Sequence, residues 1–504
     1  MEYRYIKIAL VFLAFAELFL PIGFFALFDY DEGAFSEATR EMLVGGDFIT
    51  TYLDGDFRFD KPILIYWLQA LSVKLFGLNE FAMRFPSSVA ALAWAYSIYR
   101  FVNKNFSQKS AIISSLFFIS SLQINIIAKA AIADSLLNLL ITLSMFNIYT
   151  YLQNMDKKYL YFAFFTIGLG VLDKGPVAIM IPLVVTFIYL LIIKDLKLFF
   201  KMIFDIKGIV IFLIVALPWY LAEYMACGDK FIDGFLLKHN LERFNSSFEH
   251  HSGNYFYYFF VVILGFIPFS GYLFDIFKNI KVIFKDRRYL FLMIWFLFVF
   301  IFFSFSKTKL PHYVIYGYTP LFIFLGIFFQ KYSLKNSIFV VFFLMILLFL
   351  PDIAYMLKAK VKDIYALSLI EVSKEYFDLK YQIFIAFGIV MIILSSLSNR
   401  SDLFKLFMLG AIFSTLLNFV IIRAYANLAQ EPIKEAAIFA KEHHFRVMMG
   451  SKLPTFLFYY QHLSIKKDEF KKGDLILLRS NKLKHYSNYK IYFKRSGIYL
   501  IEPL

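Results

Sequence analysis

Long apolar runs recur along most of this chain, and they limit what it can fold into. Each run covers roughly 20 residues, the helix length needed to cross the hydrocarbon core of a bilayer. The chain has 504 residues, of which 60% are hydrophobic and only 18% are charged, whereas soluble globular proteins are about 45–50% apolar. The sequence therefore predicts an all-α polytopic membrane protein.

We predict about thirteen transmembrane helices from the length of these runs. The first run follows Arg4 and lacks a small-residue cleavage site, so we interpret it as a retained helix and not as a signal peptide. The predicted spans are 6–28, 84–101, 110–127, 134–153, 159–172, 176–193, 208–224, 255–276, 289–304, 313–330, 336–351, 381–397 and 404–423.

The distribution of charge predicts how the chain is oriented. The formal net charge is +15, but Lys and Arg gather in alternate short loops such as 194–207 and 278–288, which is the positive-inside pattern. We therefore expect no nucleic-acid partner, a cytoplasmic N-terminus and, with an odd number of spans, a C-terminus on the opposite, outer side of the membrane. The single cysteine, Cys227, excludes an internal disulfide framework and a four-thiolate zinc site.

The first loop, 28–84, concentrates carboxylates in a chain that is otherwise poor in them. Two clusters in it are candidates for chemistry: the Asp31-Glu32 pair and the Asp60-Lys61-Pro62 run. A carboxylate at a membrane edge can act as a general base or bind a metal, and a lysine can bind phosphate.

Other parts of the same loop have simpler interpretations. We expect an amphipathic helix over 35–44, with Glu37 and Glu41 on its solvated face. Gly45-Gly46 is interpreted as a helix stop. Asp54 and Asp56 flank Gly55 and are interpreted as turn residues.

With the predicted topology, the unusual polar residues all fall on the non-cytoplasmic side. Charges at membrane depth are costly and tend to be functional. Acids with histidines suit a divalent metal, and lysines with an arginine suit phosphate. The pattern suggests a phosphorylated lipid bound at the outer leaflet and a carboxylate-driven transfer. The residues are Asp31, Glu32, Asp60, Lys61, Lys129, Asp134, Asp173, Lys174, Glu242, Arg243, His250, His251, Lys307, Lys309 and His312.

Several of these residues have a structural alternative. Asp134 either caps the fourth predicted helix or belongs to the site. Lys174 is interpreted as an ordinary turn lysine. His250-His251 belongs either to the site or to the loop surface. Glu17, inside the first span, has no explanation from the sequence.

The tail after about residue 426 differs from the rest of the chain. It contains a helical piece near 431–443 and short β-like runs, DLILL and KIYFKR. We predict two domains: a transmembrane domain over 1–425 and a small periplasmic α/β domain over 426–504 that packs on the membrane part.

Four blocks of sequence resemble one known family. The first-loop run DEGAFSEATREMLVGGDFITTYLDGDFRFDKPILIYWLQALSVKLFGLNEFAMRFPS is similar to the first periplasmic loop of bacterial lipid-linked-sugar glycosyltransferases. These include the 4-amino-4-deoxy-L-arabinose transferases that modify lipid A, relatives of the protein O-mannosyltransferases in the C-type membrane glycosyltransferase superfamily. The blocks LDKGPVAI, LERFNSSFEHHSGNYFYYFFVVILGFIPF and SFSKTKLPHYVIYGYTPLFIFLG agree in order. The likeness covers roughly 5–330.

The resemblance implies a membrane domain of thirteen helices with periplasmic amphipathic helices and a periplasmic site. It also implies roles for residues. Asp31 would be the catalytic carboxylate, next to Glu32, and Asp134 the second acid. Asp60 and His251 would hold a divalent metal, either zinc, magnesium or manganese. The donor phosphate would be bound by Lys61 and Arg243, and by Lys307, Lys309 and His312 lining the same cavity.

The expected function is that of an inner-membrane, inverting glycosyltransferase. We expect a monomer among membrane lipids, with an undecaprenyl-phosphate sugar donor and a lipid or glycan acceptor such as lipid A. Arabinose transferases often read D-E-T-R where this chain reads Asp31-Glu32-Gly33-Ala34, so the sugar is not assigned. Two alternatives remain: a protein O-mannosyltransferase-like enzyme with a Ser/Thr acceptor, and a lipid or sugar transporter with ionisable residues near the midplane.

Overall fold

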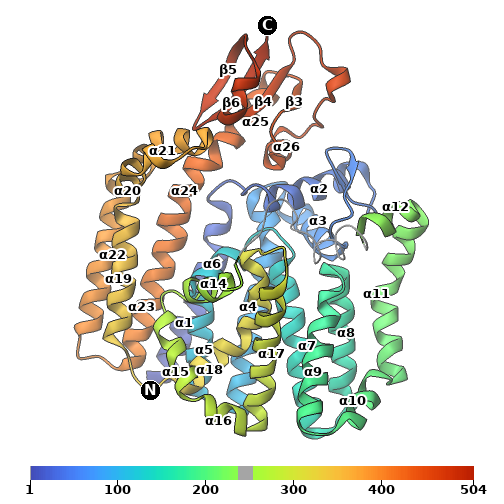
Figure 1. Ribbon diagram of the computed structural model, residues 1–504, viewed down its shortest axis with the longest axis vertical. Coiled ribbons are helices and arrows are strands. Elements are labelled where there is room, and N and C mark those ends of the chain that lie inside the picture. The colour runs from blue at the N-terminus through green and yellow to red at the C-terminus, as the bar shows by residue number, and fades with distance from the viewer. Residues whose placement is uncertain (1, 236–253) are drawn as a thin grey trace.

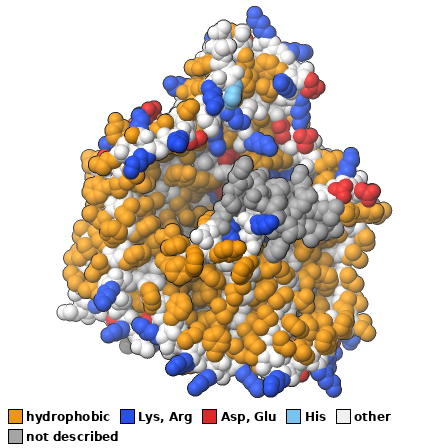
Figure 2. Space-filling view, in the orientation of Figure 1, with side chains coloured by type: hydrophobic (Ala, Val, Ile, Leu, Met, Phe, Trp, Pro, Cys, Tyr) orange, Lys and Arg blue, Asp and Glu red, His pale blue; other side chains and the backbone are white. Residues whose placement is uncertain are grey.

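The computed structural model describes residues 2–235 and 254–504. Its long helices run side by side in a bundle, a small sheet lies beyond one end, and the N-terminus lies at the other end (Figure 1). Apolar side chains cover most of the visible face of the bundle, and Lys and Arg side chains line its lower edge (Figure 2). This distribution is that of a polytopic membrane protein.

Among the described residues, seven helical segments are long and apolar enough to cross a membrane. Two further pairs are bent, by 117° and by 60°, and counting each as one span gives up to nine. The seven are α1 (Glu2–Phe19), α7 (Asp134–Asn154), α11 (Ile206–Cys227), α17 (Arg287–Phe305), η5 (Pro311–Gly317) with α18 (Tyr318–Phe328), α22 (Leu379–Leu397), and α23 (Asp402–Leu416) with α24 (Ile422–Ala429). The bent pairs are α14 (Tyr257–Gly265) with α15 (Leu273–Lys278), and α19 (Leu334–Leu348) with α20 (Leu350–Met356).

The predicted count of thirteen spans is not confirmed by length and composition. The four other predicted spans are helical, but α5 (Gln108–Ser120) and α9 (Val177–Ile192) have only 13 and 16 residues. In α4 (Glu80–Asn105) and α8 (Lys157–Lys174), charged residues interrupt the apolar pattern. All residues over 111–120 of α5 are buried. A helix enclosed by other helices contacts little lipid, so the bilayer does not fix its length or polarity.

Short helices join these long ones at the ends of the bundle. Carboxylates at the end that holds the N-terminus serve as helix caps: Asp156, Asp205 and Asp286 accept backbone N–H groups at the starts of α8, α11 and α17. The short helices are α6 (Leu122–Ile127), α10 (Leu196–Ile203), α12 (Asp229–Phe231), α16 (Ile280–Lys285) and α21 (Ile364–Tyr376).

The first loop folds into two helices and a hairpin over the opposite end of the bundle (Figure 1). α2 spans Asp31–Gly45 and ends where Gly46 adopts a φ of 70°, as the predicted helix stop requires. The strands β1 (Tyr52–Leu53) and β2 (Asp56–Phe57) pair on either side of the predicted turn. α3 (Leu64–Phe76) then leads into α4.

The interpretation of Glu37 and Glu41 as a solvated face is wrong. The Glu37 side chain is fully buried and pairs with Arg40 at 2.6 Å. Glu41 accepts the backbone N–H groups of Asp54 and Gly55 at 2.6 and 3.0 Å, and so holds the hairpin turn against α2. The helix is covered on both sides because another domain packs on it.

That covering domain is formed by the C-terminal segment. Its four-stranded sheet has the order β3-β4-β6-β5, in which only β3 and β4 are parallel. The predicted helix near 431–443 and both predicted strand runs are present. The predicted boundary at 425/426 stays a prediction, and α24 runs through it. The elements are α25 (Glu431–Glu442), β3 (Val447–Met449), α26 (Pro454–Tyr460), β4 (Leu475–Arg479), β5 (Tyr489–Arg495) and β6 (Ile498–Pro503).

Hydrogen bonds from the C-terminal segment hold the first loop at several points. Thr455 donates its backbone N–H (3.0 Å) and its hydroxyl to the Asp29 carboxylate. Ser464 donates its backbone N–H (2.7 Å) and its hydroxyl to Asp54. Tyr459 accepts the backbone N–H of Leu27 at 2.9 Å. The loop is thus fixed between the bundle and the small domain.

The contact at Asp29 is expected to depend on pH. Burial raises the pKa of Asp29 from 3.8 to about 6, although Thr455 and Arg479 favour the charged form. The docked state therefore binds a proton more tightly than the undocked state, and docking weakens as the pH rises through 6. We expect amide hydrogen exchange around Thr455, corrected for intrinsic rates, to be slower at pH 5.5 than at pH 7.5. Asp29→Asn should remove this difference; equal protection of the wild type at both pH values would contradict the docking model.

Candidate active site

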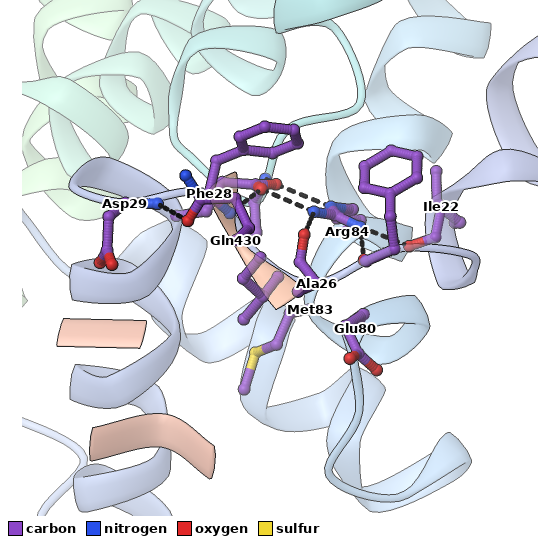
Figure 3. A network of polar contacts seen from close by, with 12 residues as sticks. Ile22, Ala26, Phe28, Asp29, Glu80, Met83, Arg84 and Gln430 are labelled. Atoms are coloured by element: carbon purple, nitrogen blue, oxygen red, sulfur yellow. Dashed lines mark hydrogen bonds and ion pairs between the residues drawn. The ribbon is translucent and has the colours of Figure 1, made fainter. Parts of the chain in front are cut away.

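A buried ion pair anchors the start of the first loop. Arg84 of α4 donates to both carboxylate oxygens of Glu32, at 2.8 and 2.7 Å, and both side chains are buried. The same guanidinium donates at 2.9 Å to the backbone carbonyls of Ile22, Phe25 and Ala26 (Figure 3). Burial alone would raise the pKa of Glu32, but the Arg84 charge lowers it below the ordinary value.

Glu32 also fixes the turn that precedes α7. Its carboxylate accepts the backbone N–H of Ala131 at 2.7 Å. Gln69 of α3 donates to the Ala131 carbonyl at 3.2 Å, and Ser87 of α4 donates to the Ile132 carbonyl at 3.1 Å. These bonds determine where the next residues, and Asp134 among them, are placed.

Asp134 lies at the centre of a buried polar cluster. Its Oδ1 accepts from Lys174 Nζ at 2.7 Å and from the Tyr316 hydroxyl at 2.9 Å, and His312 Nε2 lies 4.0 Å away. Asp134 does not cap α7, because Ala133 occupies the N-cap position and Asp134 is the first residue of the helix. The interpretation of Lys174 as an ordinary turn lysine is wrong, since the end of α8 points it at Asp134.

A second carboxylate, Asp173, lies beside this cluster. It is fully buried, and neither of its oxygens has a hydrogen-bond partner in the described part of the chain. The charges that act on it are those of Lys174, Asp134 and Lys61. Two acids and two lysines therefore act on one another in one region.

A neighbouring cluster comes from the end of the first loop. Arg58 donates to Asp60 Oδ2 at 3.0 Å and to the Tyr66 hydroxyl at 3.2 Å, and its Nε lies 2.8 Å from Asp60 Oδ1. Its guanidinium also lies over the Phe35 ring. Lys61 is half-buried and donates to the Asp60 carbonyl at 2.8 Å. Arg58, Tyr66 and Tyr316 were not predicted as site residues. The sequence pattern does not indicate a site role for these three residues, because an Arg or Tyr among apolar and aromatic residues is usually a packing residue.

A cavity of about 500 Å³ opens beside these clusters. Asp31 and His312 both line it, together with Lys129 and Arg84. Asp31 is exposed, whereas the next residue, Glu32, is buried. The charges that act on His312 are those of Asp134, Lys174, Asp31 and Lys61. The structure thus brings Asp31 and His312, both singled out in the sequence, to the wall of one cavity, with Asp134, Lys174 and Lys61 acting on His312.

Of four other predicted site residues, two lie outside the described residues and two do not line the cavity. Arg243 and His251 lie outside the described residues. Lys307 is exposed on the loop after α17. Lys309 is buried and donates to the carbonyls of Ser304 and Ser306 at 2.7 and 2.8 Å, so it closes the C-terminal end of α17. A phosphate-binding role for these lysines stays a prediction.

The predicted metal site has only one of its two residues in the described part of the chain. Asp60 is already paired with the Arg58 guanidinium, which competes with a cation for the same oxygens. Residues 2–235 and 254–504 contain no group of three or more His, Cys, Asp or Glu residues that could hold a metal ion. These residues alone do not fit a metal, and no chemical step below depends on one.

Glu17, which the sequence left unexplained, belongs to a buried network between helices. It accepts from the Thr415 hydroxyl at 2.8 Å and from the Asn418 amide. Lys129 donates to the Glu17 carbonyl at 3.1 Å and to Asn418. The network ties α1 and α23 to the turn before Asp134, so its role is structural.

Arg84→Met tests the anchoring role of the buried ion pair. It leaves Glu32 buried without a counter-charge, which typically costs about 3–5 kcal/mol of folding free energy. We expect a clearly lower unfolding temperature in detergent. Arg100→Met, at an exposed position of the same helix, should shift the temperature little. Equal unfolding temperatures for the two variants would contradict the anchoring role.

Parts of the sequence match a known protein family and several known proteins. Residues 60–221 match the family described as dolichyl-phosphate-mannose-protein mannosyltransferase. An uncharacterised protein of Aquifex aeolicus (strain VF5) is 31% identical over 328 residues, which cover 64% of this chain and 73% of that protein. The undecaprenyl phosphate-alpha-4-amino-4-deoxy-L-arabinose arabinosyl transferase of Wigglesworthia glossinidia brevipalpis is 29% identical over 66% of this chain and 60% of its own length.

The fold agrees with these sequence matches over nearly the whole chain. The crystal structure of ArnT from Cupriavidus metallidurans bound to undecaprenyl phosphate superposes with a TM-score of 0.83 at 20% identity, covering 98% of this chain and 97% of that one. By sequence, the chain spans about three fifths of the length of the Wigglesworthia arabinosyl transferase. The chain belongs to the C-type membrane glycosyltransferase family.

Proposed function

We propose that this protein transfers a sugar from undecaprenyl phosphate to an acceptor at the periplasmic face of the inner membrane. The family supports a lipid-linked sugar donor, and the printed names of the arabinosyl transferases among the relatives specify undecaprenyl phosphate. The observation that carries the proposal is the shared location of Asp31, Lys61, Asp134, Lys174 and His312 at one end of the bundle, beside a cavity of about 500 Å³.

Asp31 is the proposed general base. It is the first residue of α2 and is exposed to the cavity, whereas both oxygens of its neighbour Glu32 are engaged by Arg84. The acceptor hydroxyl oxygen attacks the anomeric carbon, and its proton passes to the Asp31 carboxylate. The bond from that carbon to the phosphate oxygen breaks, and its electron pair stays on the phosphate. A single displacement inverts the anomeric carbon.

In this scheme, Glu32 is a positioning residue and not a catalytic one. Asp134 would likewise position other groups, because its carboxylate holds Lys174 and Tyr316. Lys61, and Arg243 as predicted from the sequence, would stabilise the charge that develops on the leaving phosphate. The donor chemistry needs no nucleotide at this face.

The proposed orientation puts the N-terminus in the cytoplasm. The first loop and the small domain lie at one end of the bundle, and the N-terminus, α10 and α16 lie at the other (Figure 1). Lys and Arg side chains line that second end (Figure 2). The positive-inside rule assigns such an end to the cytoplasm, so the candidate active site would face the periplasm.

The acceptor proposed is lipid A or another envelope glycan, and the second candidate is a protein Ser/Thr hydroxyl. The family description that matches residues 60–221 names a protein mannosyltransferase and so favours testing this second acceptor. Envelope lipids, glycans and proteins from a deletion strain and its parent should be compared by mass spectrometry. A mass difference in a glycolipid supports the first acceptor, and one in protein supports the second.

Asp31→Asn tests the role of Asp31 in the same strain. Loss of the general base should lower transfer by about 10²–10⁴-fold, while expression and unfolding temperature stay as in the wild type because Asp31 is exposed. The readout is restoration of the missing glycan by the plasmid-borne gene.

Asp56→Asn is the matched control for this experiment. Asp56 lies in the same loop, is exposed, and pairs only at the surface with Lys466, so its loss should leave transfer unchanged. Near-normal product with Asp31→Asn would rule out Asp31 as the base. A deletion strain with an unaltered envelope would contradict the proposed function itself.

A further inference from the structure

A second cavity lies at the end of the bundle that holds the N-terminus, far from the candidate active site. Its volume is about 540 Å³, and its walls come from the ends of α7 and α9 and the starts of α10 and α17. Aromatic rings form part of its wall. The centroid of the Phe291 ring lies 5.3 Å from that of Tyr189 and 5.7 Å from that of Tyr149. The cavity is therefore walled by packed helices and is not a gap between mobile loops.

Positive charge dominates the lining of this cavity. Lys197, Lys201, Arg287 and Arg288 line it, whereas Asp195 is its single carboxylate among the described residues. Arg288 pairs with Asp286 at 2.7 Å. Asp195 is engaged as the cap of α10, accepting the Leu198 N–H at 3.2 Å.

In the described part of the chain, Lys197, Lys201 and Arg287 have no carboxylate partner within ion-pair distance. Their charge therefore remains available to an anion.

Helix α10 places this cavity at the level of lipid headgroups. It buries Phe199 and Met202 against the bundle, while Phe200 and Phe204 are 51% and 67% exposed. A short helix with exposed aromatic residues and lysines on another face lies in the membrane interface, with its rings at the acyl boundary. Its lysines then lie at the depth of the phospholipid phosphates.

We propose that this cavity binds the headgroup of one anionic phospholipid from the leaflet at the N-terminal end. Lys197, Lys201 and Arg287 would contact the phosphate. The acyl chains would leave past the exposed side chains of Leu191 and Ile192, at the end of α9. The apolar exit favours a lipid over a free phosphate.

The positive-inside rule alone does not explain this arrangement. That rule requires cations at this end of the bundle, but not their convergence on one concavity from α10 and α17, which are far apart in the sequence. The lipid would brace the ends of α7, α9, α10 and α17 against one another. The proposal is independent of the proposed transfer reaction, because the cavity and the candidate site lie at opposite ends.

The full-length protein in detergent tests this proposal. Binding of phosphatidylglycerol and of phosphatidylethanolamine is measured by native mass spectrometry and by the shift of the unfolding temperature. We expect phosphatidylglycerol to bind and stabilise more strongly than phosphatidylethanolamine. The double variant Lys197→Ala/Arg287→Ala should weaken phosphatidylglycerol binding by about 30-fold, since each interfacial cation contributes on the order of a fivefold change in affinity.

Lys281→Ala/Lys285→Ala is the matched control. These two exposed lysines lie on α16 at the same end but do not line the cavity, so phosphatidylglycerol binding should be unchanged. The single variant Lys201→Ala, at an exposed position, should lower the affinity for phosphatidylglycerol by a smaller factor. It replaces the double variant in the test if the double variant does not fold. Equal binding by wild type and cavity variants would overturn the proposal, as would equal stabilisation by soluble glycerol 3-phosphate, which would indicate a plain anion site.

Discussion

The placement of the first loop depends on the buried ion pair between Glu32 and Arg84. Neither charge has access to water, so each must be satisfied by protein groups. Arg84 meets this requirement with Glu32 and three carbonyls of the segment that precedes the loop, and Glu32 also takes the Ala131 N–H. One pair therefore fixes the entry of the loop, the start of α2 and the turn before Asp134. Asp31 is held at the cavity because its neighbour is held in the interior.

The small C-terminal domain completes this arrangement from the other side. A Cβ atom on Gly33 would lie 2.5 Å from the Thr455 backbone nitrogen and 2.9 Å from an Asp29 oxygen. A larger residue at position 33 is thus incompatible with the observed docking of Thr455 on Asp29. This steric limit explains why Gly33 stands where the D-E-T-R pattern has threonine; it concerns position 33 and not Ala34.

The two ends of the bundle use their charges differently. At the end that holds the N-terminus, acids such as Asp156 and Asp205 cap helices, and lysines gather around a cavity at the membrane interface. At the other end, Asp134 and Lys174 are buried and paired with each other. Glu32 and Arg84 form a second buried ion pair at that end.

The sequence predicted the parts that depend on local patterns. Helices were found in all thirteen predicted segments, and the Gly46 helix stop, the hairpin turn and the strands of the tail were placed correctly, because periodicity and turn chemistry act over a few residues. The span count was not confirmed, because α5 is enclosed by neighbouring helices, α9 has only 16 residues, and charged residues interrupt the apolar pattern of α4 and α8. Glu37 and Lys174 were misjudged for a related reason: a single sequence does not show which faces another element covers.

The residues alone determined that this is a membrane-spanning helical protein with its unusual acids in the first loop, because hydropathy and charge are properties of the chain itself. Only the tertiary structure decided which acids, in this loop and beyond it, have partners. Glu32 is neutralised by a residue 52 positions away and Asp134 by one 40 positions away. Pairing across such separations depends on helix packing, which no local pattern encodes.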